Sequence, residues 1–357
     1  MKHLLFLAIA LLILAMPISA GGQRHRQTIV EGKITVISVI FPSYDFVRAI
    51  AGNRVNNILL TAPGAESHTF EPSPRDIINI RNSDLFIYTG GESAVWMSRI
   101  LEAAEISSGR VRVMEMLSLV DPLVGSPCLA DHHHHDHHHH THHTHHDHGH
   151  HTHHHHGHHH THHHHHHHDD CDDYCVIAHD QLEFDPHVWT SPRNVRLIVA
   201  AIAETLSELD SANAYFFRQN AAAFIAQLDE IDAAFQAVVD GARRRTIVVA
   251  DRFPFRYFVH HYGLEYFAAF DDCAAHAEPD AATIAFLINT IRSENIPVVF
   301  HIELGNERLA NIIAEETGAR ALLLHSAHNL SVRDFNNGVT FLDVKRNNVE
   351  ALRAALW

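Results

Sequence analysis

Histidine, the commonest metal-binding side chain in proteins, dominates one stretch of this sequence. From 132 to 168, 29 of 37 residues are histidine, and the remainder are Thr, Asp and Gly. Imidazole suits zinc, copper and nickel, and a dense histidine tract is a compositional sign of metal binding. The tract is interior, long and interrupted, which argues against an expression tag. Because it has no apolar residue to offset its ordering entropy, we expect a mobile, solvated loop.

Other candidate ligands stand in four short polar segments that follow predicted strands or precede a predicted helix. In open parallel sheets, ligands bind beyond the carboxyl ends of the strands. Four such loops meeting in one cleft would form a closed, tetrahedral, histidine-rich site of the kind that zinc favours. The segments are 61–74 with His68, 184–192 with His187, 250–252 with Asp251, and 324–328 with His325 and His328.

The elements that must position these residues alternate between strands and helices, which is typical of βαβ units and parallel sheets. A helical pattern from 192 to 239, with a break at Asp210-Ser211, connects two such halves. The predicted fold class is therefore α/β, with two lobes, each a parallel sheet flanked by helices, joined by a long connecting helix. Expected strands are 34–40, 55–60, 84–88, 111–114, 246–250, 265–270, 298–300 and 320–324; expected helices are 43–51, 75–82, 94–104, 255–261, 280–294, 306–317 and 336–355.

These patterns divide the chain into consecutive parts. Residues 1–20 are typical of a secretory signal peptide, with Lys2, a short apolar run and small residues at the end. An N-terminal lobe (33–190) carries the histidine-rich loop (131–169), a helical region (191–241) follows, and a C-terminal lobe (245–357) completes the chain. Since no other apolar run reaches the roughly 18 to 20 residues that span a bilayer, we expect a soluble, exported body. An uncleaved signal that anchors the chain stays open.

Charge and cysteine content restrict the functional classes further. The formal net charge of −16 argues against nucleic-acid binding, which needs basic stripes. Cys128, Cys171, Cys175 and Cys273 form an even count, which outside the cytosol suggests disulfides, and Cys128 brackets the histidine tract with Cys171 or Cys175. A zinc site made by Cys171 and Cys175 with nearby histidines is the alternative. The pairing cannot be deduced from the sequence.

Three features together resemble the metal-binding proteins of ABC importers for zinc and manganese, the ZnuA/TroA-like (cluster A-I) family. The first is Pro63-Gly64 with His68 and 71–74 (Glu-Pro-Ser-Pro), and the second is 185–189 (Asp-Pro-His-Val-Trp) followed by Ser191-Pro192. The third is the connecting helix with an acidic, histidine-rich loop ahead of it. The resemblance covers residues 33–357. It implies a two-lobed extracytoplasmic protein that hands a metal to a membrane permease.

Carried over position by position, the resemblance implies that His68 and His187 are the first two ligands. The third family ligand is usually His or Glu, but alignment on Tyr257-Phe258 puts Arg252 there, and Arg cannot coordinate. Asp251 is then the competent neighbour, unless it simply pairs with Arg252. His325 stands at the fourth position, with His328 as its substitute. We expect Glu66, His301 and Glu303 near the cleft, orienting ligands or capping helices.

We therefore expect a zinc-binding transport protein that captures Zn²⁺ between two lobes and delivers it to the permease of an ABC importer. Imidazole ligands favour zinc over manganese, which prefers oxygen donors. A zinc hydrolase is disfavoured because no His-Glu-x-x-His motif occurs, so we expect no enzymatic activity. A metal store or adhesin that depends on the histidine tract is the alternative function. The chain is expected to be a monomer.

Overall fold

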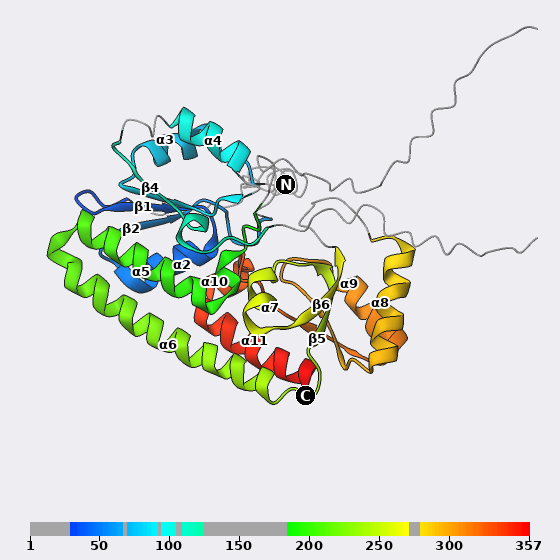
Figure 1. Cartoon of the computed structure of the whole chain (residues 1–357). Helices are drawn as coiled ribbons and strands as arrows, with labels where there is room; N and C mark the ends of the chain where they lie inside the picture. The colour runs from blue at the N-terminus through cyan, green and yellow to red at the C-terminus, as the bar shows by residue number, and fades with distance from the viewer. Residues whose placement is uncertain (1–28, 67–69, 92–93, 105–108, 125–183, 271–278) are drawn as a thin grey trace, which may run out of the picture.

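The computed structural model describes residues 29–66, 70–91, 94–104, 109–124, 184–270 and 279–357. Two parallel four-stranded sheets flanked by helices make up the architecture, which confirms the predicted α/β class (Figure 1). Strand order is β2-β1-β3-β4 in the first sheet and β6-β5-β7-β8 in the second. The strands are β1 (Thr35–Ser38), β2 (Asn56–Leu59), β3 (Leu85–Tyr88), β4 (Arg112–Glu115), β5 (Thr246–Arg252), β6 (Glu265–Phe270), β7 (Val298–His301) and β8 (Arg320–Leu323).

The central strands of each sheet are buried because helices cover the sheets. All four residues of β1 are buried, and six of the seven residues of β5 are buried. The covering helices of the N-terminal lobe are α2 (Phe41–Ala51), α3 (Pro74–Arg81), α4 (Ala94–Ala103) and α5 (Pro192–Leu209). Those of the C-terminal lobe are α7 (Arg256–Tyr262), α8 (Ala281–Glu294), α9 (Glu307–Thr317) and α11 (Phe341–Leu356). The short helix α10 (Val332–Asn336) packs against the N-terminal lobe, where the Phe335 ring contacts that of Tyr44 on α2.

The helical stretch between the lobes breaks where the sequence predicts. Asp210 ends α5, its side chain accepts a hydrogen bond from the Asn213 N–H, and α6 (Ala214–Asp240) then begins. Helix α6 packs against α5 and α2 of the first lobe and against α11 of the second. It therefore forms a long support along both lobes, as Figure 1 shows.

The last predicted helix, 336–355, is wrong at its start. The structure has two helices there, α10 and α11, separated around Gly338, whose φ is 74°. Thr340 caps α11: its side chain accepts from the Asp343 N–H, while the Asp343 carboxylate accepts from the Thr340 N–H. This reciprocal capping box fixes the new helix start more strongly than the helical periodicity that runs through it.

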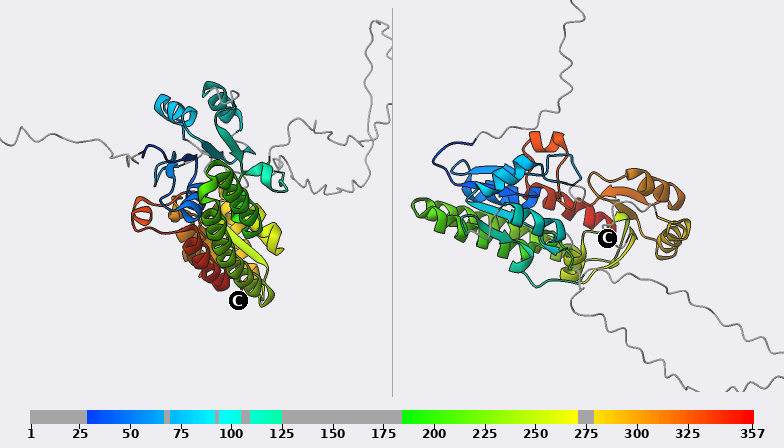
Figure 2. Two further views of the ribbon diagram at one scale, coloured as in Figure 1. Left: turned by 90° about the vertical axis from the view of Figure 1, so that its left-hand side faces the viewer. Right: turned by 90° about the horizontal axis from the view of Figure 1, so that it is seen from above.

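The principal core joins the two lobes. It contains Phe86 of β3, Phe217 and Phe235 of α6, Phe258 of α7 and Phe341 of α11 in one cluster of buried side chains. A smaller cluster lies between the second sheet and helices α8 and α9. Seen from above, α11 lies between the blue N-terminal part and the orange C-terminal part (Figure 2). The carboxyl ends of both sheets are thereby held close to each other.

Candidate metal centre

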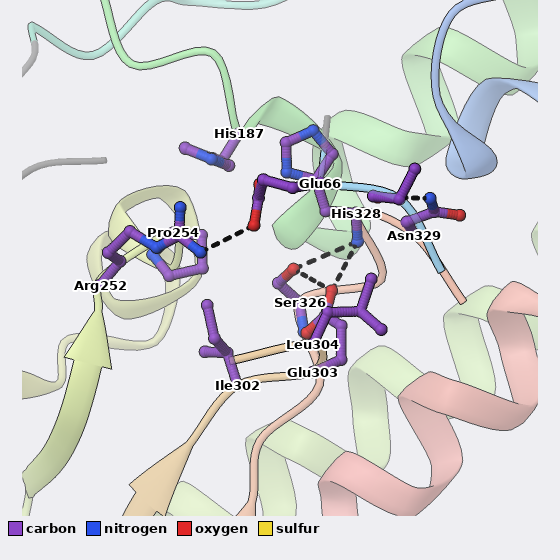
Figure 3. A pocket seen from close by; sticks show the side chains of 11 residues that line it. Glu66, His187, Arg252, Pro254, Ile302, Glu303, Leu304, Ser326, His328 and Asn329 are labelled. Atoms are coloured by element: carbon purple, nitrogen blue, oxygen red, sulfur yellow. Dashed lines mark hydrogen bonds and ion pairs between the residues drawn. The ribbon is translucent and has the colours of Figure 1, made fainter. Parts of the chain in front are cut away.

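A pocket lies where the carboxyl ends of the two sheets approach each other (Figure 3). Ala65 and Glu66, which follow β2, line it together with His187. The opposite wall comes from the C-terminal lobe, from loops that follow β5, β7 and β8, and includes Arg252 and His328. The position agrees with the rule that open parallel sheets bind ligands beyond their strand ends.

His187 is buried and held in a fixed orientation by Asp185. Oδ1 of Asp185 accepts from the His187 main-chain N–H at 2.7 Å and lies 2.9 Å from His187 Nδ1. A carboxylate oxygen accepts, so Nδ1 carries the proton in this contact and Nε2 is the nitrogen with a lone pair. Carboxylate–histidine pairs of this kind orient the imidazole in metal sites. His187 thus has the geometry of a metal ligand.

Hydrogen bonds with the C-terminal lobe fix the segment around His187. The Tyr257 hydroxyl donates to the Asp185 carbonyl at 2.9 Å and accepts from the Leu123 N–H at 3.0 Å. Burial raises the pKa of Tyr257 to about 12, so the hydroxyl keeps its proton at neutral pH. Trp189, which is fully buried, donates from Nε1 to the Ser326 carbonyl at 3.0 Å. Both contacts cross the lobe boundary.

His328 faces His187 from the other lobe. The ring centroids are 5.6 Å apart at an angle of 87°, and the Trp189 ring lies 4.9 Å from that of His328. The His328 main-chain N–H donates to Glu303 Oε1 at 2.9 Å. Among the predicted residues that the structure describes, His187 and His328 are the two histidines that line the pocket.

Glu303 organises the loop that carries His328. Its carboxylate accepts from the Ser326 main-chain N–H, the Ser326 hydroxyl and the His328 N–H. Burial opposes ionisation of this carboxyl, but His325 and the Ser326 donors lower the pKa of Glu303 to about 2. The charged form therefore persists at neutral pH and holds the loop in one conformation.

His325 lies on the far side of this loop and does not line the pocket. Its Nδ1 accepts from the Ala327 N–H at 2.9 Å and lies 3.3 Å from Glu303 Oε2. Its main chain exchanges two hydrogen bonds with the Asn348 side chain on α11. The structure thus gives His325 the contacts of a residue that anchors the loop, and brings its substitute, His328, into the pocket.

Asp251 lies behind the pocket wall, whereas Arg252 lines it. Asp251 Oδ1 accepts from the Arg252 N–H at 2.8 Å. Its Oδ2 lies against Gly305, where a Cβ would come within 2.2 Å of it, so a side chain at position 305 would displace the carboxylate. Burial raises the pKa of Asp251. Arg252 reaches across the pocket and pairs with Glu66 Oε2 at 2.9 Å. Both residues stand in the polar loops that the sequence identifies, but no local pattern indicates that they pair, because they are 186 positions apart.

The loop after β2 is tied to the His328 loop. The Asn329 side chain donates to the carbonyls of Ala62 and Ala65 at 2.8 and 2.9 Å, and the Gly64 N–H donates to the Leu330 carbonyl at 2.7 Å. Gly64 has φ 80°, and a Cβ there would lie 3.2 Å from the Val332 side chain, so glycine suits this position. The sequence singled out Gly64 but not Asn329.

Several predicted residues lie outside the described ranges: His68, the tract 132–168, the four cysteines and the signal region 1–20. The predictions made for them stay predictions. Within the described ranges, no three His, Cys, Asp or Glu side chains gather into a group that could hold a metal ion. His187 and His328 are the two histidines among the described residues that line the pocket. His301, which the sequence also places near the cleft, is half-buried, and its Nδ1 lies 3.3 Å from the Ile302 carbonyl.

The sequence of this chain is similar to those of zinc-uptake proteins. The model of the family described as "Zinc-uptake complex component A periplasmic" (ZnuA) matches residues 36–355. The zinc-binding protein AdcA of Streptococcus pyogenes is 28% identical over 328 residues, which are 92% of this chain and 57% of that protein. The high-affinity zinc uptake system protein ZnuA of Bacillus subtilis is 25% identical over 326 residues, which are 91% of this chain and 88% of that protein.

Solved structures share the fold. The Zn(II)-bound ZnuA-like domain of Streptococcus pneumoniae AdcA superposes with a TM-score of 0.66 at 23% identity, over 91% of this chain and 99% of that domain. The full-length AdcA relatives are longer than that domain, and this chain spans little more than half of their length. Over the part of the chain that is described, no helix is both long and apolar enough to cross a bilayer.

Proposed function

Because the chain belongs to the ZnuA family of periplasmic zinc-uptake components, we propose that it captures Zn²⁺ in the pocket between its lobes and delivers it to an ABC-type importer. Members of this family are metal carriers and not enzymes. Zinc is therefore the transported ion, which the protein binds and releases unchanged. Capture outside the cytoplasmic membrane, as a monomer that hands the ion to a permease, completes the proposal.

The single observation that carries the proposal is the approach of His187 to His328. With a Zn–N distance of about 2.0 to 2.1 Å and tetrahedral angles, two coordinated imidazole rings have centroids roughly 5 Å apart. The separation of 5.6 Å between these rings is close to that value. The two ligands come from different lobes, so zinc would also stabilise the lobe contact.

We propose His68 as the third ligand. Glu66, two positions before it in the chain, lines the pocket, and Asn329 anchors the loop that leads to it. His325 and Asp251 stay as candidates from the sequence, but their contacts favour His328 as the imidazole from the C-terminal lobe. A set of three imidazoles suits zinc better than manganese, which prefers carboxylate and water oxygens.

Isothermal titration with Zn²⁺ in the presence of a competing chelator tests the proposal. The full chain should bind one equivalent tightly, and His68→Ala and His187→Ala should each lose that equivalent, because one vacant position forfeits much of the coordination energy. Asn220→Ala, which removes a hydrogen bond to Ile50 on the helical face away from the pocket, is the control and should bind normally. A tight equivalent that survives in His187→Ala would overturn the site.

The alternative, a metal store or adhesin that depends on the histidine tract, makes a different prediction in the same titration. Storage would give many weak equivalents and no tight one. We favour transport because Trp189, Tyr257 and Asn329 hold the pocket walls together across the lobe boundary. Such fixed walls are what a tight single site requires, and a loose store does not need them.

A further inference from the structure

Arg252 lines the pocket wall on the side of the C-terminal lobe, facing Glu66. Its NH2 group lies 2.9 Å from Oε2 of Glu66, and the two side chains come from different lobes (Figure 3). The Arg252 side chain is 17% exposed and that of Glu66 is 34% exposed, so the pair is partly shielded from water. A guanidinium has no lone pair available for a metal, and it matches a carboxylate well.

We propose that Arg252 determines the metal selectivity of the pocket by keeping the Glu66 carboxylate out of the donor set. This inference rests on the proposed function and concerns the same pocket. Of the two carboxylates that line the described part of the pocket, Glu303 already accepts three hydrogen bonds from the Ser326–His328 segment. With Glu66 paired as well, the imidazoles of His187 and His328 are the donors that these walls present to a metal. Zinc accepts such a set, whereas manganese depends on oxygen donors. Arg252 thus selects against hard divalent cations rather than for zinc alone.

The pair resists opening for two structural reasons. Arg252 is held at its own main chain, because its N–H donates to Asp251 Oδ1 at 2.8 Å, and its Nε lies 3.9 Å from the same oxygen. If Glu66 turned to a metal, the partly buried guanidinium would lose the carboxylate that it contacts at 2.9 Å. Removing one member of a shielded ion pair is costly, since the remaining charge is then poorly solvated. A manganese ion would have to supply that energy before it gained the carboxylate.

The experiment compares the Zn²⁺ and Mn²⁺ affinities of the full chain and of Arg252→Met, Glu66→Gln and the double variant, by competition titration at one pH and salt concentration. Methionine keeps an unbranched stem of similar length but removes the charge. We expect the zinc-to-manganese affinity ratio to fall at least about tenfold in Arg252→Met, through a gain in manganese affinity, which is the scale of outer-sphere effects in metal sites. Glu66→Gln should keep the parental ratio, and the double variant should return to it.

Arg112→Met is the matched control, because Arg112 pairs with Glu208 at 3.1 Å on the surface, where both side chains are more than half exposed. It should leave the ratio unchanged. The inference is overturned if manganese affinity stays high in the double variant, since Arg252 would then act by charge repulsion alone. It is also overturned if Arg252→Met weakens both metals equally and lowers the melting temperature, since the pair would then serve only to join the lobes.

The same data separate this inference from the proposed function. A parental chain that binds zinc tightly, with an unchanged ratio in Arg252→Met, overturns the selectivity role and leaves zinc capture standing. A parental chain that binds neither metal overturns zinc capture and the selectivity role together.

Discussion

The indole of Trp189 donates a hydrogen bond of 3.0 Å to the carbonyl of Ser326, in the other lobe. Trp189 follows the pocket residue His187 by two positions, and Ser326 precedes His328 by two. The bond therefore connects the two segments that bring imidazoles into the pocket. Because Trp189 is fully buried and its ring also contacts that of His328, it sets the distance between these imidazoles.

Replacing Trp189 with Phe should weaken zinc binding by about tenfold or more, because the loop that carries His328 loses an anchor next to the metal. The buried Ser326 carbonyl would also lose a donor, which costs roughly 1 to 3 kcal/mol of folding free energy. Competition titration and chemical denaturation measure the two effects. Trp357→Phe is the control: Trp357 also donates from its indole, to the Val238 carbonyl at 2.9 Å, but far from the pocket. Equal zinc affinity in the two variants would contradict the positioning role.

His328→Ala should remove most of the zinc-dependent rise in melting temperature, whereas His325→Ala should retain most of it. A ligand that binds only the native state raises stability by mass action, so the shift reports the affinity of the folded site. His328 faces His187, and His325 contacts Glu303 and Asn348 instead. Thermal scans with and without zinc make the measurement. The reverse pattern would return His325 to the ligand set.

Glu303→Gln should lower the unfolding free energy of the metal-free protein by roughly 1 to 3 kcal/mol at pH 7, because the buried donors of Ser326 and His328 lose a charged acceptor. The folded-state pKa of this carboxyl is about 2, below the ordinary value of 4.5. A depressed carboxyl pKa contributes stability that is fully present above pH about 4.5 and disappears as the pH falls toward 2. The difference between the two proteins should therefore shrink over that interval. Urea denaturation at several pH values, in the presence of a chelator, measures it.

Glu208→Gln provides the comparison, since its carboxylate pairs with Arg112 on the surface and should contribute little. If Glu303→Gln loses the same free energy at pH 3 as at pH 7, hydrogen-bond geometry and not ionisation explains its effect.

Deletion of 131–169 should leave one tight zinc equivalent and remove a weak, multi-site phase in calorimetry. We predict that the tract is an accessory collector, since a sequence without apolar residues has no burial to offset the cost of ordering it on binding, about 1 to 2 kcal/mol per residue fixed. Acidification toward pH 5.5 should remove the weak phase first, because an unperturbed imidazole titrates near pH 6.5 and loses its metal affinity when it is protonated. Loss of the tight equivalent on deletion would make the tract itself the site.

Local patterns in the sequence determined most of the fold. Alternating apolar runs and helical periodicity placed all eight strands that the structure describes, and Asp210 marked the end of a helix where the structure has it. The predicted helix 336–355 is wrong only at its start, because its periodicity continues across Gly338, whereas the capping box at Thr340 starts a new helix. Strand ends also identified the polar loops of the pocket, because parallel strands bring their carboxyl ends to one edge.

Only the tertiary structure decided which side chains of those loops face the pocket. His325 and His328 are three positions apart, and Ala327 between them has φ 66°, a left-handed conformation that alanine rarely adopts and that no sequence pattern indicates. The turn places one imidazole against Glu303 and the other opposite His187. Likewise, Arg252 and Glu66 meet because two separately folded sheets pack against one core. Spacing along the chain predicts which residues lie in the loops near the pocket. Which of their side chains face the pocket depends on how the two lobes pack, and that packing involves residues far apart in the sequence.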